Sequence, residues 1–167
     1  MTDVARLMIL VIGLFFMGLP AMTGAQGAQV AFGNTQRDRD LPVEVTSDNL
    51  NVNQNDNTAI FTGSVVIGQG EMRLSAPRVL VIYLSDKSGI ESLEATGGVT
   101  VVSGADAAEA ARADYNLITG MIEMQGDVLL VQGENAITGD TMIVDTTAGT
   151  AQVSGRVKTL LQPKAKE

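Results

Sequence analysis

The chain has 167 residues, a formal net charge of −8, and neither cysteine nor histidine, so zinc, copper and haem sites and Ser-His-Asp or Cys-His catalysis are not expected. The negative charge argues against a nucleic-acid partner, because phosphate neutralisation needs a basic surface. Aromatic residues make up 4% of the chain, which is too few for a platform that stacks sugars or bases. The composition therefore predicts no catalytic residue, no metal and no cofactor.

The N-terminus has the features of a secretory signal. Arg6 precedes an apolar stretch over residues 7–19, which is shorter than the about 20 residues that a membrane span needs. Small residues predict cleavage after Ala25, with Gly27 as the second choice, so residues 1–25 form the signal peptide. An uncleaved anchor is the alternative. In both cases the folded part lies outside the cytoplasm.

Residues 26–40 are small and polar and are expected to form a flexible leader. The segment 41–161 consists of alternating apolar segments and polar turns, typical of an all-β domain, and the charged tail 162–167 is expected to be disordered. Residues 105–113 favour helix by propensity, but we interpret them as a strand of small residues because the repeat requires one. The run 79–84 is apolar at both its odd and its even positions, so the strand is either covered on both faces or placed where the sheet curls.

The motif Gly-x-Val recurs about every 30 residues in this segment. A period of this size without a helical pattern indicates one β-unit that is repeated and stacked, because a single unit cannot bury its own apolar face. Glycine within a strand marks a bulge or a tight bend, so the glycines predict a corner repeated along the stack. The motif occurs at Gly63-Ser64-Val65, Gly97-Gly98-Val99, Gly126-Asp127-Val128 and Gly155-Arg156-Val157.

The strand motifs of the segment 41–161 form an ordered series. It opens with Pro42-Val43-Glu44-Val45-x-Ser47-Asp48-x-Leu50-x-Val52 and Ala59-x-Phe61-x-Gly63-x-Val65-Val66. It continues through Ser75-Ala76-x-x-Val79, Ile90-x-x-Leu93-x-Ala95-x-Gly97-x-Val99, Ala113-x-Tyr115 and Gly139-Asp140. This series, over about residues 41–161, resembles the LptA/OstA family of periplasmic lipopolysaccharide-transport proteins.

The resemblance implies a twisted, open β-jellyroll of about 16 short antiparallel strands, located in the periplasm. Its apolar interior would shelter the acyl chains of lipopolysaccharide. Copies or homologous domains would join end to end into a bridge between the two membranes. The ends of that bridge would meet a membrane-anchored LptC-like component and an outer-membrane LptD-like component.

The residues themselves support an apolar interior. A lipid that crosses an aqueous compartment needs a continuous apolar surface, because each exposed methylene costs about 0.8 kcal/mol. Methionine suits such a surface because its unbranched side chain adapts to its neighbours. The same-phase residues expected to line it are Val52, Phe61, Val65, Ile67, Met72, Leu74, Tyr115, Leu117, Ile122, Met124, Val128, Leu130, Met142 and Val144. Each of them can equally be ordinary core.

The two ends of the stack are expected to expose edge strands, which add partner strands readily. The edge residues predicted for docking are Val43, Val45, Leu50, Val153, Val157 and Leu161. Arg156 and Lys158 on the last strand can meet Glu44 and Asp48 on the first strand of the next copy.

Asp48, Asp114, Asp127 and Asp140 recur near strand starts and corners, where they are expected to cap turns rather than to catalyse. Three other functions remain open. They are an LptC-like anchored protein of the same pathway, an exported scaffold with a dry interior, and a carbohydrate-active β-helix enzyme. The last is disfavoured by the few aromatic residues.

Overall fold

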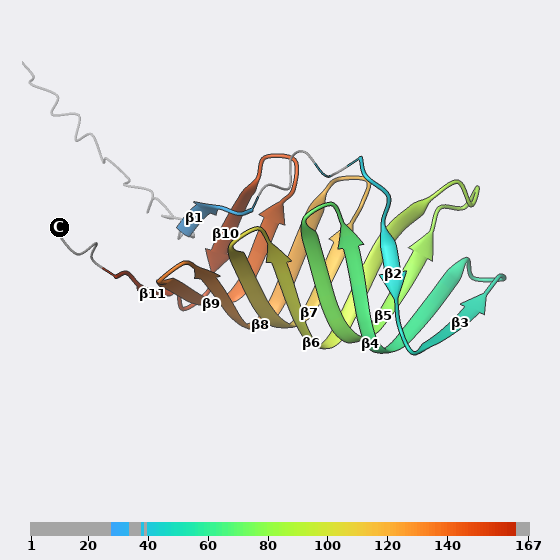
Figure 1. Ribbon diagram of the computed structural model, residues 1–167, viewed down its shortest axis with the longest axis horizontal. Helices are drawn as coiled ribbons and strands as arrows, with labels where there is room; N and C mark the ends of the chain where they lie inside the picture. The colour runs from blue at the N-terminus through green and yellow to red at the C-terminus, as the bar shows by residue number, and fades with distance from the viewer. Residues whose placement is uncertain (1–27, 34–37, 39, 163–167) are drawn as a thin grey trace, which may run out of the picture.

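The computed structural model describes residues 28–33, 38 and 40–162, and the described chain is a single antiparallel sheet of 11 strands (Figure 1). The strands are β1 (Ala28–Ala31), β2 (Glu44–Thr46), β3 (Asn49–Asn53), β4 (Thr58–Gln69), β5 (Met72–Tyr83), β6 (Ile90–Ser103), β7 (Asp106–Asn116), β8 (Met121–Gln132), β9 (Asn135–Asp145), β10 (Thr150–Ser154) and β11 (Lys158–Leu160). The order across the sheet is β1-β10-β9-β8-β7-β6-β5-β4-β2, with β11 added to β9 and β3 added to β4. The predicted all-β, open jellyroll is therefore confirmed.

The strands are fewer and longer than the about 16 short ones expected. Strands β4 to β9 have between 11 and 14 residues because each of them bends without ending. The alanine-rich patch 105–113 lies almost entirely within β7, as the repeat predicted. Within the described residues no helix has the length and hydropathy needed to cross a membrane. The predicted signal peptide lies outside the described residues, as does the tail from 163 onward.

The bends occur at the predicted glycine corners. Gly63, Gly97, Gly126 and Gly155 have positive φ values of 76°, 95°, 84° and 74°, and the residue that follows each of them also has a positive φ. The pairing register shifts at these points in β4, β6 and β8, because two residues of the corner face one residue of the neighbouring strand. The facing residues are Asp48, Pro77, Ala111 and Asp140. Two-residue and one-residue corners therefore alternate from strand to strand.

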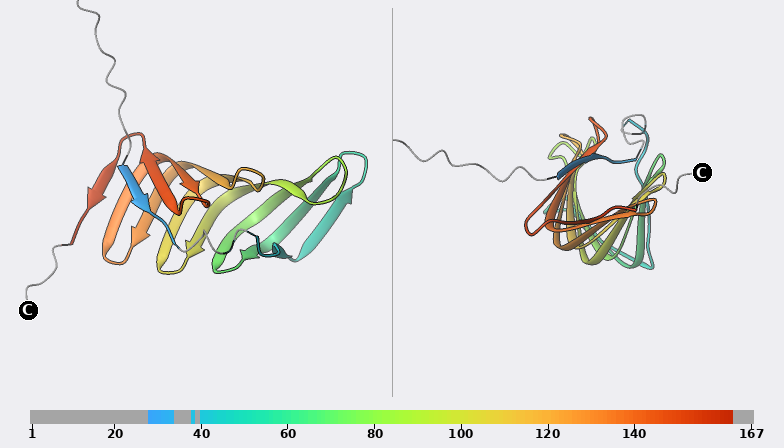
Figure 2. Two further views of the ribbon diagram at one scale, coloured as in Figure 1. Left: turned by 90° about the horizontal axis from the view of Figure 1, so that it is seen from above. Right: turned by 90° about the vertical axis from the view of Figure 1, so that its left-hand side faces the viewer.

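The aligned corners fold the sheet into two walls that face each other (Figure 2). We call wall A the part that contains β2, β11 and the row Val45-Ile67-Leu74-Val101-Ala108-Leu130-Ile137-Thr159. Wall B contains β3, β10, β1 and the row Val52-Ala59-Val81-Leu93-Tyr115-Ile122-Val144-Ala151-Val30. Both rows face inward, and most of their residues belong to one buried core.

The segment predicted as a flexible leader contains a strand instead. Ala28 to Ala31 form β1, which pairs antiparallel with β10, and Phe32 is fully buried in the core. The prediction failed because four residues with a single β-branched side chain carry too little periodicity to indicate a strand. Pairing with β10, far along the chain, stabilises the segment.

Candidate functional site

The inner face that the sequence predicted forms the core of the sheet. Phe61 and Leu117 are partly buried against this core, whereas Val52 is 58% exposed at the end of the wall B row. The other predicted residues are fully buried, namely Val65, Ile67, Met72, Leu74, Tyr115, Ile122, Met124, Val128, Leu130, Met142 and Val144. Whether these residues contact lipid stays a prediction.

Sequence reasoning missed part of this face. Phe32 was assigned to the leader, and the small side chains of Ala108 and Ala113 gave no signal of burial, although all three are completely buried. In the run 79–84, Val79 and Val81 point into the core, while Leu80 is only half-buried on the outer face. The run therefore follows the same inward and outward alternation as its neighbours.

The inner face is apolar over most of its length, and its buried polar side chains are Gln69, Ser103 and Thr146. At the wall A edge, Asp106 lies opposite Ser103 and points to the same inner side, where its carboxylate accepts a hydrogen bond from the Gly33 nitrogen. The hydroxyl of Tyr115, on wall B, donates a hydrogen bond of 2.9 Å to Gln69 Oε1, on wall A. Both residues lie far from the corners in their strands, so this bond joins the two walls near their free edges. The Gln69 side-chain nitrogen also donates to the carbonyl of Leu41 at 3.1 Å.

Replacement of Tyr115 by phenylalanine is expected to lower the free energy of unfolding by about 1–2 kcal/mol, because a buried acceptor on Gln69 loses its donor. Urea denaturation of the purified chain measures the change. Tyr83→Phe, at the half-buried end of the same wall, is the matched control and is expected to change stability by less than about 0.5 kcal/mol. Equal losses in the two variants would contradict the assigned role of the bond.

The inner face reaches solvent at the N-terminal end of the sheet. Leu50 and Val52 on β3 pair with Phe61 and Ala59, so their side chains point to the inner side, yet they are 56% and 58% exposed. A cavity of about 290 Å³ adjoins this end. Its lining includes Val52, Tyr83 and Lys87. An amphiphile with an anionic group therefore finds apolar surface and a cation side by side here.

The predicted edge residues fall into three groups. Val43 and Val45, at β2, pack against the core from the N-terminal end, and Leu50 lies on the edge strand β3. Val157 lies between β10 and β11 and Leu161 follows β11, and both are exposed. Val153 differs from the others, because β1 pairs with the edge of β10 and Val153 is completely buried, so in this structure the edge is not exposed. These positions place exposed apolar side chains at both ends of the sheet.

Arg156 is already bound within the chain, which changes its predicted role in docking. Its Nε donates to Asp140 Oδ1 at 3.0 Å across the last corner. This hydrogen bond lowers the pKa of Asp140 and raises that of Arg156. Both side chains line a surface cavity of about 420 Å³, together with Lys158 and Asp127. Of the two predicted docking cations, Lys158 forms no ion pair within the described part of the chain.

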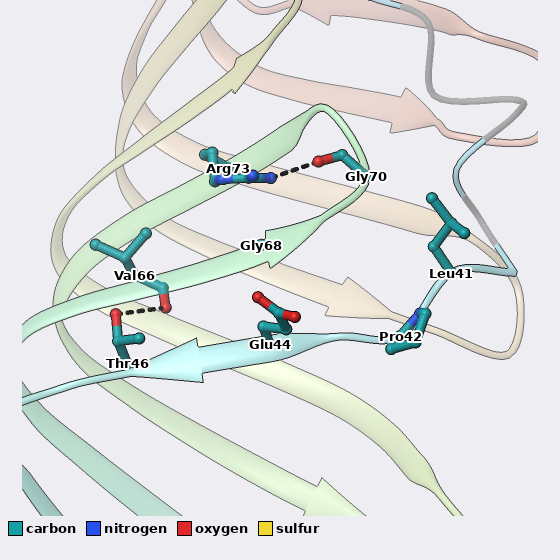
Figure 3. A pocket seen from close by; sticks show the side chains of 8 residues that line it. All are labelled: Leu41, Pro42, Glu44, Thr46, Val66, Gly68, Gly70 and Arg73. Carbon is teal, nitrogen blue, oxygen red and sulfur yellow. Dashed lines mark hydrogen bonds between the residues drawn. The ribbon is translucent and has the colours of Figure 1, made fainter.

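Another cavity, of about 340 Å³, lies on the outer surface beside β2 (Figure 3). Arg73 donates to the Gly70 carbonyl and Thr46 to the Val66 carbonyl along its wall. These side chains alternate with the inward-facing Ile67 and Val45, so the cavity is separate from the apolar inner face.

The four recurring aspartates are spread along the sheet instead of converging on one site. Asp48 and Asp140 face corner glycines, Asp127 follows the glycine of a third corner, and Asp114 pairs with Arg112 at 2.6 Å. Among the described residues no group of three acidic side chains is arranged to hold a metal ion.

Comparisons with known proteins agree with this architecture. The family model described as the LptA/(LptD N-terminal domain) LPS transport protein matches residues 44–150. An uncharacterized protein of Rhizobium meliloti (strain 1021) is 30% identical over 154 residues, which cover 86% of this chain and 83% of that protein.

Two further comparisons involve lipopolysaccharide transport. The lipopolysaccharide export system protein LptA of Escherichia coli (strain K12) is 27% identical over 109 residues, which span 62% of this chain and 59% of that protein. The crystal structure of LptH, the LptA homologous periplasmic component from Pseudomonas aeruginosa, superimposes with a TM-score of 0.68. The identity there is 19%, over 75% of this chain and 99% of LptH, so this likeness supports the fold.

Proposed function

Because the chain belongs to the LptA/LptD N-terminal-domain family of lipopolysaccharide transport proteins, we propose that it carries lipopolysaccharide across the periplasm and shelters the lipid A acyl chains between its two walls. The observation that carries this proposal is the predominantly apolar inner face, which runs through every strand from β3 to β10 and reaches solvent at Leu50 and Val52. Asp106 brings a carboxylate to this face only at the wall A edge, where it accepts a hydrogen bond from the Gly33 nitrogen.

The energetics favour such a surface. An acyl chain of about a dozen carbons loses on the order of 10 kcal/mol on exposure to water, at about 0.8 kcal/mol per methylene. The inner rows supply apolar contacts at each strand, and neighbouring strands are about 4.8 Å apart. An acyl chain can therefore advance from strand to strand without meeting water. Met72, Met124 and Met142 contribute flexible side chains that can repack around an acyl chain.

Binding requires the walls to separate, because the inner residues pack against each other in the structure. The corners are suited to this movement, since the two-residue corners are bulges with positive φ that already interrupt the ladder of backbone hydrogen bonds. Away from the corners, the walls are held by side-chain packing, by the Tyr115–Gln69 bond and by the segment around β1.

In this proposal, strands at the two ends of the sheet pair with neighbouring proteins and so build the bridge between the membranes. Wall A ends in β2 and β11, and wall B ends in β3 and, beyond β10, β1. The edges of β2 and β3 would add to an LptC-like inner-membrane component or to the C-terminal end of another copy. The C-terminal end would add in the same way to an LptD-like outer-membrane component. Charge supports head-to-tail joining of copies, because Lys158 lies at one end and Glu44 and Asp48 at the other.

Photocrosslinking in living cells tests the lipid site. With a photoreactive residue at Phe61, Met124 or Leu130, we expect lipopolysaccharide adducts on the inner face. The matched controls are the outward-facing neighbours Ile60 and Val131, which differ from Phe61 and Leu130 by one position along β4 and β8. These controls are expected to give no adduct.

The dense packing of the inner face favours one competing function, that of an exported scaffold with a dry interior. Ile122, Met124 and Met142 are all completely buried, as in an ordinary core. A folded and exported chain that gives no adduct at any inner position would support the scaffold and contradict lipid transport.

A further inference from the structure

The N-terminal strand is bound to the far end of the sheet through many contacts. Backbone pairing runs from Ala28 opposite Val153 to Ala31 opposite Thr150, and the Phe32 nitrogen donates to the Gly149 carbonyl at 3.0 Å. On the opposite wall, Gln132 donates to the Ala31 carbonyl at 2.7 Å and the Gly33 nitrogen donates to Asp106 at 2.8 Å. β1 and Phe32 therefore cover the wall B edge and join it to wall A.

The alternation of corners shows what the C-terminal end of the sheet lacks. β4, β6 and β8 have two-residue corners, and each is followed by a strand with a one-residue corner, namely β5, β7 and β9. β10 and β11 are joined by the last two-residue corner, Gly155-Arg156, and among the described residues no strand beyond them provides the matching one-residue corner.

A second copy can supply this corner with β2 and β3. The Asp48 nitrogen donates to the Gly63 carbonyl at 3.0 Å, and the Asp140 nitrogen donates to the Gly155 carbonyl at 2.9 Å, so the β2–β3 corner has the same hydrogen bond as the corner of β9. The chain passes from wall A to wall B through β2 and β3, and from wall B to wall A through β10 and β11. β2 and β3 of a second copy would therefore lie antiparallel to β11 and β10 of the first.

The register of β8 with β9 shows where the second copy's strands would lie. Met124 and Ile122 face Met142 and Val144 there. The same spacing from the corners places Leu50 of the second copy opposite Val153, and Val52 opposite Ala151. These are the positions that Ala28 and Val30 occupy in the chain's own sheet. β1, with the sequence Ala-Gln-Val-Ala, thus takes the place of Leu-Asn-Val-Asn in β3 and repeats its alternation.

We propose that β1 is a removable cover on the docking edge of β10, and that β3 of a second copy displaces it when two chains join end to end. This inference rests on the end-to-end joining in the proposed function and adds the strand exchange that regulates it. On wall A, no described strand pairs with the outer edge of β11, so this edge can receive β2. The register places Lys158 opposite Thr46, between Glu44 and Asp48 of the second copy. Association therefore begins on wall A and is completed on wall B once β1 leaves.

The apparent association constant equals the intrinsic constant multiplied by the fraction of chains in which β1 has left β10, so the cover weakens association. It also protects an edge that would otherwise pair with any exposed strand. Leu50 and Val52, both more than half exposed in the single chain, become buried in the joined sheet, which compensates for the release of Val30 and Phe32.

A disulfide that locks β1 in place tests the proposal. Gln29 and Gln152 are directly opposite in β1 and β10, and the chain has no cysteine of its own. Directly opposite residues of antiparallel strands have the separation that a disulfide needs. The variant Gln29→Cys/Gln152→Cys, oxidised at high dilution, is compared with its reduced form by sedimentation velocity over a range of concentrations.

The matched control is Ile143→Cys/Gln152→Cys, which links β10 to β9 and leaves β1 free. We expect oxidation of the Gln29 pair to weaken end-to-end association at least about tenfold, and oxidation of the control to have no effect. Phe32→Ala, which loosens the cover, is expected to strengthen association by at least about tenfold.

Equal association of the oxidised and reduced Gln29 pair would overturn the proposal, because the docking strand would then add without removing β1. Failure of all the chains to associate would also overturn it, since β10 would not be a docking edge. Neither result alters the photocrosslinking of lipid on the inner face, so the failure of this inference and that of the transport function are distinguishable.

Discussion

Leu130→Ala is expected to lower the free energy of unfolding by about 3 kcal/mol, the middle of the range measured for buried leucines. Leu130 is completely buried in the wall A part of β8, where it faces Ile137 on one neighbouring strand and Ala108 on the other. The small side chain of Ala108 cannot expand to fill the lost volume, so a cavity remains. Urea denaturation with a fitted midpoint and slope measures the loss.

Val131→Ala is the matched control, because this residue is next along β8 and points to the outer face. We expect a loss below about 1 kcal/mol there, since the half-buried side chain leaves no closed cavity. A loss at Val131 equal to that at Leu130 would show that the walls do not enclose a common core. If the Leu130 variant still binds lipid, added lipid is expected to raise its free energy of unfolding, because a ligand that binds only the folded state shifts the folding equilibrium toward that state.

The inward and outward alternation of β4 to β9 was predictable from residues such as Ile67, Met124 and Val144. Ile67 and Met124 lie at period 2 from the corner glycines Gly63 and Gly126, Val144 lies at period 2 from Met142, and the structure buries all three. The two-residue corners were also predictable, because a glycine within a strand, as at Gly63, Gly97 and the later repeats, indicates a bend. The length of the strands was not predictable, since the sequence does not show whether a chain ends or continues at a bend.

Contacts between distant segments were also beyond the sequence. Gln69 lies between two glycines, a pattern typical of a turn, yet it belongs to β4 and is buried, with a hydrogen bond from Tyr115. Val153 was interpreted as an edge because it lies in the last strands of the chain. β1 covers it through a pairing that neither segment specifies by its own pattern. Burial of a polar or terminal residue thus depends on partners that periodicity alone does not identify.

Gly126→Ala is expected to destabilise the chain by about 3 kcal/mol, because it combines two costs at one corner. A side chain at a φ of 84° is strained, which costs about 1–2 kcal/mol. The new Cβ would also lie 2.8 Å from the Cβ of Ala111, which belongs to the facing strand and cannot move without shifting its backbone. Asp127, which follows with a φ of 48°, shows that the second corner position accepts a side chain.

Gly104→Ala separates the two costs, since Gly104 has a φ of 61° and open space where its Cβ would lie. We expect this control to lose only about 1 kcal/mol, from backbone strain alone. The difference between the variants in urea denaturation therefore measures the close approach of neighbouring strands at the corner. Equal losses would mean that the corner has room for a methyl group, and the close contact with Ala111 would then not explain why glycine occupies the first position of each corner.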